Sequence, residues 1–221
     1  MSSLARRVVA EALGTALLLA TVVGSGIMGD HLSGGNVGLA LLVNTIATAA
    51  TLVVIITAFG PVSGAHFNPV VTGVEVAARR LPARDGAAFV AAQVAGAALG
   101  VVLANVMFGE PAVKWSTHER AGFPLLLGEF VATFGLLGVI VAVSRRAPER
   151  VPAMVAAWIT AGYWFTSSSS FANPAVTLAR TLTDTFGGIR PADVAGFVVA
   201  QVLGAVAGYA VFDWLVPVRR D

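Results

Sequence analysis

Two short motifs, each with an asparagine before a proline, have the residue types and spacing that suggest a shared chemical role: Asn68-Pro69-Val70 and Asn173-Pro174-Ala175. Asparagine is among the best helix N-caps because its side-chain oxygen accepts hydrogen bonds from amides of the first turn. Proline fits that turn because it has no N–H group to leave unpaired. Each motif therefore predicts a helix start. A single motif would most simply cap a helix in a surface loop, so the surroundings of the two copies decide whether they do more.

The composition indicates a protein that lies within a membrane. Of the 221 residues, 57% are hydrophobic and 12% are charged, whereas a soluble domain is roughly half apolar and a quarter charged. The charges cluster between apolar stretches of about twenty residues, the length of helix that crosses a bilayer. We predict one all-α membrane domain over residues 1–221, with six transmembrane helices at about 7–28, 36–59, 84–108, 122–144, 149–166 and 191–215.

Two further apolar pieces, residues 63–79 and 169–182, are too short to cross a membrane. Each contains one of the Asn-Pro motifs near its start. We therefore expect two re-entrant half-helices that begin at Asn68 and Asn173.

The basic residues predict the orientation of the chain. With the amino terminus inside, the cytoplasmic ends of the spans collect Arg6, Arg7, Arg79, Arg80, Arg84, Arg145, Arg146, Arg150, Arg219 and Arg220. The other side keeps fewer cations, so the positive-inside rule places both termini in the cytoplasm, in a multi-pass protein of the cell inner (plasma) membrane. The formal net charge of +2 is then a topology signal, and no nucleic-acid partner is expected.

The two halves of the chain, about 1–110 and 120–221, repeat one another. Residues 89–94 (FVAAQV) match residues 197–202 (FVVAQV), and each copy is followed by two glycines four residues apart, Gly96 and Gly100 against Gly204 and Gly208. Such glycines mainly permit close helix packing. With three spans per half, the second copy is inverted relative to the first. Inverted repeats are typical of transport proteins, whose substrate path lies near the midplane between the repeats.

Two half-helices that enter from opposite faces would bring their amino termini together at the midplane. The positive ends of both helix dipoles would then oppose cations and protons. The side-chain amides of Asn68 and Asn173 could donate hydrogen bonds to the oxygen of a passing solute. The pattern predicts a passive pore for small uncharged solutes.

These residues resemble the aquaporin or major intrinsic protein family, in the strings SGAHFNPVVT (63–72) and FANPAVT (171–177) and in the repeated glutamates. The resemblance covers nearly the whole chain. It implies a bundle of six helices and two half-helices, a pore in each subunit, and a homotetramer in the lipid bilayer. It also implies that Glu11 and Glu129 are buried acids that hold the half-helix loops. His66 would pack beside the first motif, with a pH-dependent gate as the alternative.

The chain departs from the family at the constriction. Most members have an arginine directly after the second motif, where this chain has Val176. Counting from the motifs places the other filter positions at Thr48, Ala161 and Ser170, with Gly162 as the alternative to Ala161. A ring of these residues contains no bulky or charged group, so we expect a filter wider and less polar than one selective for water.

Arg180 lies four residues after Val176, on roughly the same helix face. It could line an outer vestibule, or it could reach the membrane interface or pair with Asp184. The string FANPAVTLARTLTD also resembles a bacterial aquaglyceroporin-like branch associated with arsenic resistance. That resemblance implies glycerol-like polyols and neutral metalloid hydroxides such as arsenite as cargo, beside water.

Two other classes of protein fit the sequence less well. An ion-coupled secondary transporter also uses inverted repeats and broken helices, but it ordinarily needs charges inside the membrane, and only Glu11 and Glu129 are available. An intramembrane enzyme is disfavoured because the sequence contains no cysteine and no nucleophile with a basic partner at membrane depth. We expect no enzyme activity, no cofactor and no metal site.

Overall fold

The computed structural model describes residues 2–217, and within them the chain folds as eight α-helices joined by loops and short 3-10 turns. The helices are α1 (Leu4–Leu32), α2 (Val37–Ser63), α3 (Pro69–Ala77), α4 (Ala83–Met107), α5 (Phe123–Arg146), α6 (Val151–Phe165), α7 (Pro174–Ala179) and α8 (Val194–Leu215). The 3-10 turns are η1 (Pro148–Arg150), η2 (Arg180–Leu182) and η3 (Pro191–Asp193). The predicted all-α fold is confirmed.

Five helices, α1, α2, α4, α5 and α8, are long and apolar enough to cross a membrane. The helix at the predicted fifth span, α6, has 15 residues and follows directly on η1. The two short helices, α3 and α7, begin at the prolines of the two Asn-Pro motifs. Arg219 and Arg220, which contributed to the predicted orientation, lie outside the described residues.

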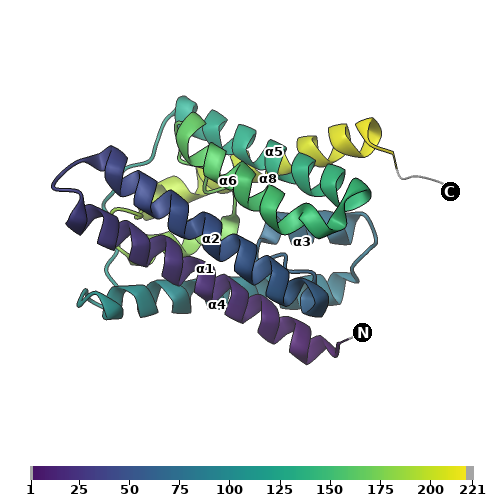
Figure 1. Cartoon of the computed structure of the whole chain (residues 1–221), viewed down its shortest axis with the longest axis horizontal. Coiled ribbons are helices and arrows are strands. Elements are labelled where there is room, and N and C mark those ends of the chain that lie inside the picture. The colour runs from purple at the N-terminus through teal and green to yellow at the C-terminus, as the bar shows by residue number, and fades with distance from the viewer. Residues whose placement is uncertain (1, 218–221) are drawn as a thin grey trace.

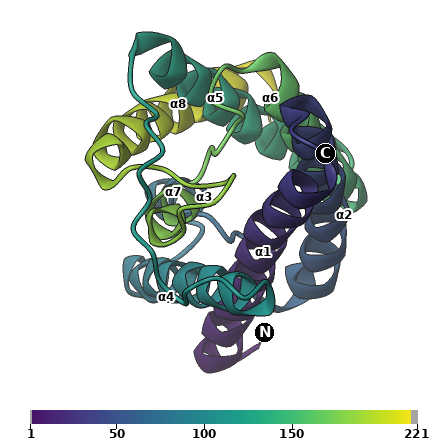
Figure 2. The same ribbon diagram turned by 90° about the vertical axis from the view of Figure 1, so that its left-hand side faces the viewer.

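The longer helices form a ring around the two short ones, as the end-on view shows (Figure 2). In the side view, α1 begins and α8 ends at the same end of the bundle (Figure 1). We call this the terminal end. The opposite end, which carries residues 33–36 and the long connection between α4 and α5, we call the loop end. The ring holds α3 and α7 in the interior, where their starts are shielded from lipid.

Glycines allow two pairs of helices to touch backbone to backbone. A Cβ atom on Gly100 of α4 would lie 2.2 Å from the carbonyl oxygen of Ala16 in α1, and one on Gly208 of α8 would lie 2.3 Å from that of Phe134 in α5. Both distances are far below van der Waals contact. The repeated glycines therefore serve packing, and the pairs α1–α4 and α5–α8 are equivalent members of the two halves.

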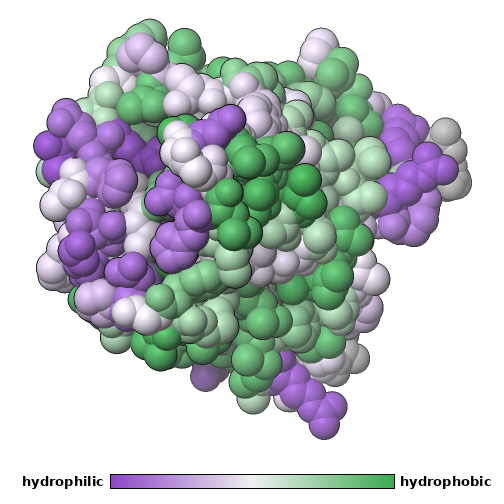
Figure 3. Space-filling model, turned by 60° about the vertical axis from the view of Figure 1, so that its left-hand side comes forward, coloured by the Kyte–Doolittle hydropathy of each residue, from purple (hydrophilic) through white to green (hydrophobic). Residues whose placement is uncertain are grey.

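The outer surface has the polarity expected of a membrane protein. Hydrophobic side chains form a band over the middle of the molecule, while hydrophilic ones gather at the loop end and at the terminal end (Figure 3). Large apolar side chains of the long helices are exposed in the isolated chain, Val54 of α2 at 63% and Leu99 of α4 at 66% among them. In a bilayer, such residues face lipid or another subunit.

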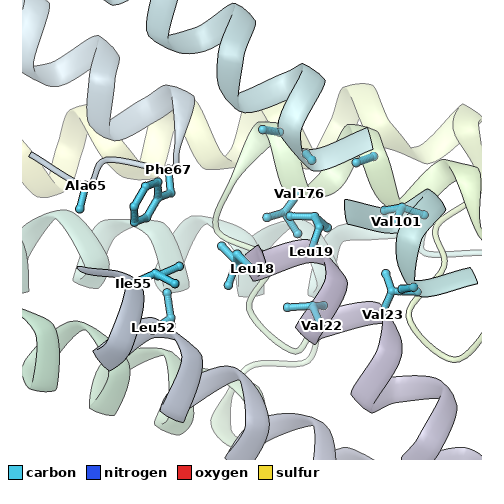
Figure 4. Packing of buried hydrophobic residues seen from close by; sticks show 14 of the residues in the cluster. Leu18, Leu19, Val22, Val23, Leu52, Ile55, Ala65, Phe67, Val101 and Val176 are labelled. Atoms are coloured by element: carbon cyan, nitrogen blue, oxygen red, sulfur yellow. The ribbon is translucent and has the colours of Figure 1, made fainter. Parts of the chain in front are cut away.

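The interior between α1, α2, α4 and the half-helices is filled with aliphatic side chains. Leu18, Leu19 and Val22 of α1 lie near Val176 of α7, while Phe67 lies near Ile55 of α2 (Figure 4). This cluster fixes the position of both half-helix starts against the ring.

Candidate functional site: the meeting of the two half-helices

Each half-helix is capped by its own asparagine. The Asn68 Oδ1 atom accepts from the backbone N–H of Val70 at 3.1 Å. The Asn173 Oδ1 atom accepts from the N–H groups of Ala175 and Val176 at 3.0 and 3.3 Å. The first residues of the helices are Pro69 and Pro174. The local chemistry predicted from the motifs is thus present at both starts.

The two starts are also linked to each other. The Asn68 side-chain Nδ2 donates to the carbonyl oxygen of Ala172 at 2.8 Å, and the Asn173 Nδ2 donates to the carbonyl oxygen of Phe67 at 2.8 Å. A side-chain amide carries two N–H donors, so each asparagine keeps one N–H beyond this link. Both asparagines line a cavity inside the ring of helices. They are therefore placed to donate into it.

The loops before the half-helices have an unusual backbone. Five non-glycine residues have left-handed φ values: Ala65 at 51°, Phe67 at 49°, Ser169 at 59°, Ser170 at 54° and Ala172 at 49°. This conformation is costly for such residues and persists only where the surroundings impose it. Within residues 2–217, the carbonyl groups of Ala65, His66, Ser170 and Phe171 accept no hydrogen bond. All four residues line the cavity, so these oxygens are available as acceptors.

A fully buried glutamate holds each loop in this conformation. The Glu11 carboxylate accepts from the backbone N–H groups of His66 and Phe67 at 3.0 and 2.7 Å, and from the Ser63 hydroxyl at 2.6 Å. The Glu129 carboxylate accepts from the N–H groups of Phe171 and Ala172, both at 2.8 Å. The two acids thus satisfy amides that would otherwise be unpaired at this depth.

A glutamine and a threonine extend the hydrogen-bond network around each glutamate. We call each set of glutamate, glutamine, threonine and loop amides a cradle. Gln93 Nε2 donates to Glu11 at 2.8 Å and to the Thr72 hydroxyl at 2.9 Å. In the second half, Gln201 Nε2 donates to Glu129 at 2.6 Å and to the Thr177 hydroxyl at 2.8 Å. Both glutamines were visible in the repeated FVxAQV strings, but the repeat alone did not indicate their role.

His66 breaks the symmetry of the two cradles. Its Nδ1 atom lies 3.0 Å from the Thr72 hydroxyl, and its ring meets that of Phe89 edge to face with 5.5 Å between centroids. Since the Thr72 oxygen accepts from Gln93, its hydrogen is free to be donated to Nδ1. A neutral imidazole then carries its proton on Nε2. His66 lines the cavity and adds a donor to it.

The cavity has a volume of about 560 Å³ and extends past both half-helix starts. Glu75 and Arg145 line it toward the terminal end, and Thr48 and Arg180 line it toward the loop end. One wall consists of aliphatic side chains from α1, α2 and α6, namely Leu18, Val22, Leu52, Ile56, Val155 and Ile159. The polar loop groups lie opposite. The cavity thus has one apolar and one hydrogen-bonding side.

Three of the four predicted filter residues line this cavity: Thr48, Ser170 and Val176. Ala161 does not, because it is exposed on the outer face of α6. The placement of Ala161 in the filter is wrong. The next residue, Gly162, is buried against Ser170, so close that a Cβ atom would lie 2.6 Å from the Ser170 Oγ.

Larger groups also line this part of the cavity. The hydroxyl groups of Tyr163 and Thr48 lie 3.3 Å apart, and Tyr163, Phe171 and Arg180 all line the cavity. The expectation that the constriction lacks bulky and charged groups therefore does not hold for the lining as a whole. Ser170 Oγ is buried without a hydrogen-bond partner among residues 2–217, which leaves its hydroxyl for a solute.

Arg180 is only 5% exposed and neither reaches the interface nor pairs with Asp184. Its guanidinium carbon lies 3.5 Å from the centroid of the Phe171 ring, and its Nε donates to the carbonyl of Gly187. Asp184 instead binds the backbone N–H and hydroxyl of Thr117, at 2.8 and 3.0 Å, and pairs with Lys114 at 3.3 Å. These contacts hold the pKa of the Asp184 carboxyl below its usual value.

No group of three or more histidine, cysteine, aspartate or glutamate side chains suitable for a metal ion occurs in the part of the chain that the structure describes.

Comparison with known proteins agrees with this arrangement. The family model for "Major intrinsic protein" matches residues 1–166. The chain is 55% identical over 217 residues to the aquaglyceroporin AqpS of Rhizobium meliloti, covering 98% of this chain and 93% of that protein. It is 30% identical to the probable aquaporin AqpM of Archaeoglobus fulgidus, covering 96% and 98%.

Among solved structures, the aquaglyceroporin from Plasmodium falciparum superposes with a TM-score of 0.71 at 21% identity, over 98% of this chain and 97% of that one. This likeness concerns the fold. The sequence matches go further, and the chain belongs to the major intrinsic protein family of membrane channels.

Proposed function

We propose that this protein is a passive channel for water and small uncharged solutes such as glycerol, with arsenite and other neutral metalloid hydroxides in the same class. The observation that carries the proposal is the cavity that runs past Asn68 and Asn173, lined on one side by donors and acceptors and on the other by aliphatic side chains. The relatives AqpS and AqpM bear the names aquaglyceroporin and aquaporin, which supports the same class of cargo.

The polar side compensates a solute for its lost hydration. Asn68, Asn173 and His66 supply N–H donors, while the free carbonyls of the two loops supply acceptors. A polyhydroxylated solute both donates and accepts, so it can exchange water contacts for these groups at little cost. Its carbon or metalloid face then lies against the aliphatic wall.

Cations are opposed at the same place. The amino termini of α3 and α7 converge at the linked asparagines, so two positive dipole ends point at the path. The carboxylates that hold the two loops, Glu11 and Glu129, have their oxygens occupied by backbone and glutamine donors. Glu75, which lines the cavity toward the terminal end, is paired with Arg80. None of the three is available to stabilise a cation in transit.

We assign the filter to Thr48, Tyr163, Ser170 and Val176, with Arg180 at the outer vestibule. Most family members have an arginine at the position of Val176. The small aliphatic side chain of Val176 favours solutes larger and less polar than water. The Thr48 and Tyr163 hydroxyl groups of this ring lie within hydrogen-bond distance of each other, whereas the Ser170 hydroxyl has no partner within residues 2–217 and is left for a solute. Such a ring fits glycerol-like polyols and metalloid hydroxides, which resemble one another in shape and hydroxyl content.

The family relationship also supports a homotetramer with a pore in each subunit, in which part of the apolar band meets neighbouring subunits. The position of α1 and α8 at one end of the bundle is consistent with both termini in the cytoplasm of the inner membrane. The residues of the terminal end include Arg7, Arg80 and Arg145, as the positive-inside rule requires for a cytoplasmic face.

Ion-coupled transport is disfavoured by the same contacts. A coupling ion needs a carboxylate that changes partners during the cycle, whereas Glu11 and Glu129 are fully buried and hold the loop backbone. The decisive experiment is stopped-flow permeability of proteoliposomes to water, glycerol, urea and arsenite. The proposal expects rates well above those of empty liposomes for the neutral solutes and no added leak of sodium. A protein that passes none of these solutes would overturn it.

A further inference from the structure

A second cavity, of about 250 Å³, lies at the loop end and shares Arg180 with the conduction cavity. Arg120 from the connection between α4 and α5 lines it as well, together with Asn44, Ser167 and Ser169. Arg180 therefore stands where the two cavities adjoin. A guest held by Arg180 from the outer side would sit at the entrance to the path.

The two arginines are held against the same aromatic ring. The guanidinium carbon of Arg120 lies 5.0 Å and that of Arg180 lies 3.5 Å from the centroid of Phe171. Arg120 is further fixed by hydrogen bonds from its Nε to the carbonyl of Gly188 at 2.7 Å and from its NH2 to that of Phe186 at 3.4 Å. The two cations are thus brought close by contacts to neutral groups, an aromatic ring and backbone carbonyls.

Within residues 2–217, no carboxylate oxygen lies within 4.0 Å of either guanidinium group, although the other outer cations Lys114 and Arg190 are ion-paired. Both terminal amino groups of Arg180 and the NH1 group of Arg120 bond to no acceptor in that part of the chain. Burial of the Arg120 guanidinium lowers its pKa, and the attraction of the more distant Glu129 carboxylate offsets this only in part, as expected for a buried cation with no ion pair.

Buried cations are expensive unless they are paired. The forked donors of arginine match the oxygens of phosphate, sulfate and related groups. We propose that the outer vestibule binds a small tetrahedral oxyanion between Arg120 and Arg180, and that the bound anion obstructs entry to the conduction cavity. The anion is an inhibitor and not cargo, because between Arg180 and the arginines of the terminal end the described residues offer only neutral donors, those of Ser170, Asn68 and Asn173 among them, beside an aliphatic wall. Neutral donors on one side alone do not repay the hydration that a full negative charge would lose.

The binding test uses purified protein in detergent and sulfate as the probe, titrated calorimetrically at constant ionic strength set with chloride. Arg180→Gln should weaken sulfate binding roughly tenfold to a hundredfold, since it removes charge-assisted hydrogen bonds. Arg120→Gln should weaken it as well and serves as the second variant if the first does not fold. Lys114→Gln, at an exposed and ion-paired outer cation, should bind sulfate as the wild type does.

The transport test measures glycerol uptake by proteoliposomes with and without external sulfate. The expected result is a several-fold, saturable inhibition of the wild type and of Lys114→Gln, and little inhibition of Arg180→Gln. Absence of sulfate binding to the wild type would overturn the proposal, as would equal binding by all variants. The binding arm does not depend on conduction, so a protein that binds sulfate but conducts nothing would refute the channel function and leave this site standing.

Discussion

Asn68 and Asn173 hold one another's loops: each donates its side-chain amide, over 2.8 Å, to the carbonyl of the residue that precedes the other. The two inverted halves are therefore joined at their centre by a reciprocal pair of hydrogen bonds. The same side chains cap α3 and α7 through their oxygens. Each asparagine thus caps the start of a helix, links the two halves and keeps one N–H group that can donate to a solute.

Replacing one amide by its isosteric acid tests this link. In Asn173→Asp the side chain can still cap α7, but a carboxylate cannot donate to the Phe67 carbonyl and instead faces it. We expect a lower melting temperature and a loss of glycerol flux, measured by tryptophan fluorescence and by stopped flow. An unchanged melting temperature would mean that the link contributes nothing to the joining of the halves.

The carboxylate of Glu129 is predicted to be structural. In Glu129→Gln the new NH2 group would face either the N–H of Phe171 or those of Ala172 and Gln201, and each buried donor left unpaired costs about 1–3 kcal/mol. Thermal unfolding should therefore occur at a clearly lower temperature. The matched control is Glu149→Gln, whose side chain is 69% exposed and whose loss should have almost no effect. Equal stability of the two variants would contradict the cradle described above.

Val176 is predicted to set the width of the filter. Val176→Arg adds a long cationic side chain at a buried position that lines the cavity, so glycerol flux should fall several-fold while water permeability is largely retained. Val176→Leu adds bulk without charge and separates the two effects. If glycerol flux is unchanged in Val176→Arg, the filter lies elsewhere.

The sequence predicts some parts of the fold and of the site better than others. Helix starts at Asn68 and Asn173 were predictable because capping is local chemistry. The face of α6 that lines the cavity was not, because residues 151–165 are apolar on every side and carry no clear periodicity. Counting filter positions from the motifs therefore gave Ala161, whereas the buried residue beside Ser170 is the next one, Gly162. The proximity of Arg120 and Arg180 could not be predicted either, because the two residues are distant in sequence and come together by packing on the same Phe171 ring.

The outer loops should make stability depend on acid pH. The pKa of Asp184 is lowered, first by the backbone N–H of Thr117, then by its hydroxyl and by Lys114. Its contribution to stability is therefore present above the unfolded pKa of about 4 and is lost as the pH falls through the folded value. The melting temperatures of wild type and Asp184→Asn should differ at pH 6 and converge below about pH 4. A gap that stays constant with pH would exclude this carboxylate as the cause.

The central claim is passive conduction of neutral solutes, and the concentration dependence of glycerol uptake tests it most directly. Initial rates should be measured in wild-type proteoliposomes over a wide range of external glycerol, with and without proton and sodium gradients. The account predicts rates that rise in proportion to the glycerol gradient and do not respond to either ion gradient. Saturation at low concentration, or acceleration by a proton or sodium gradient, would contradict it.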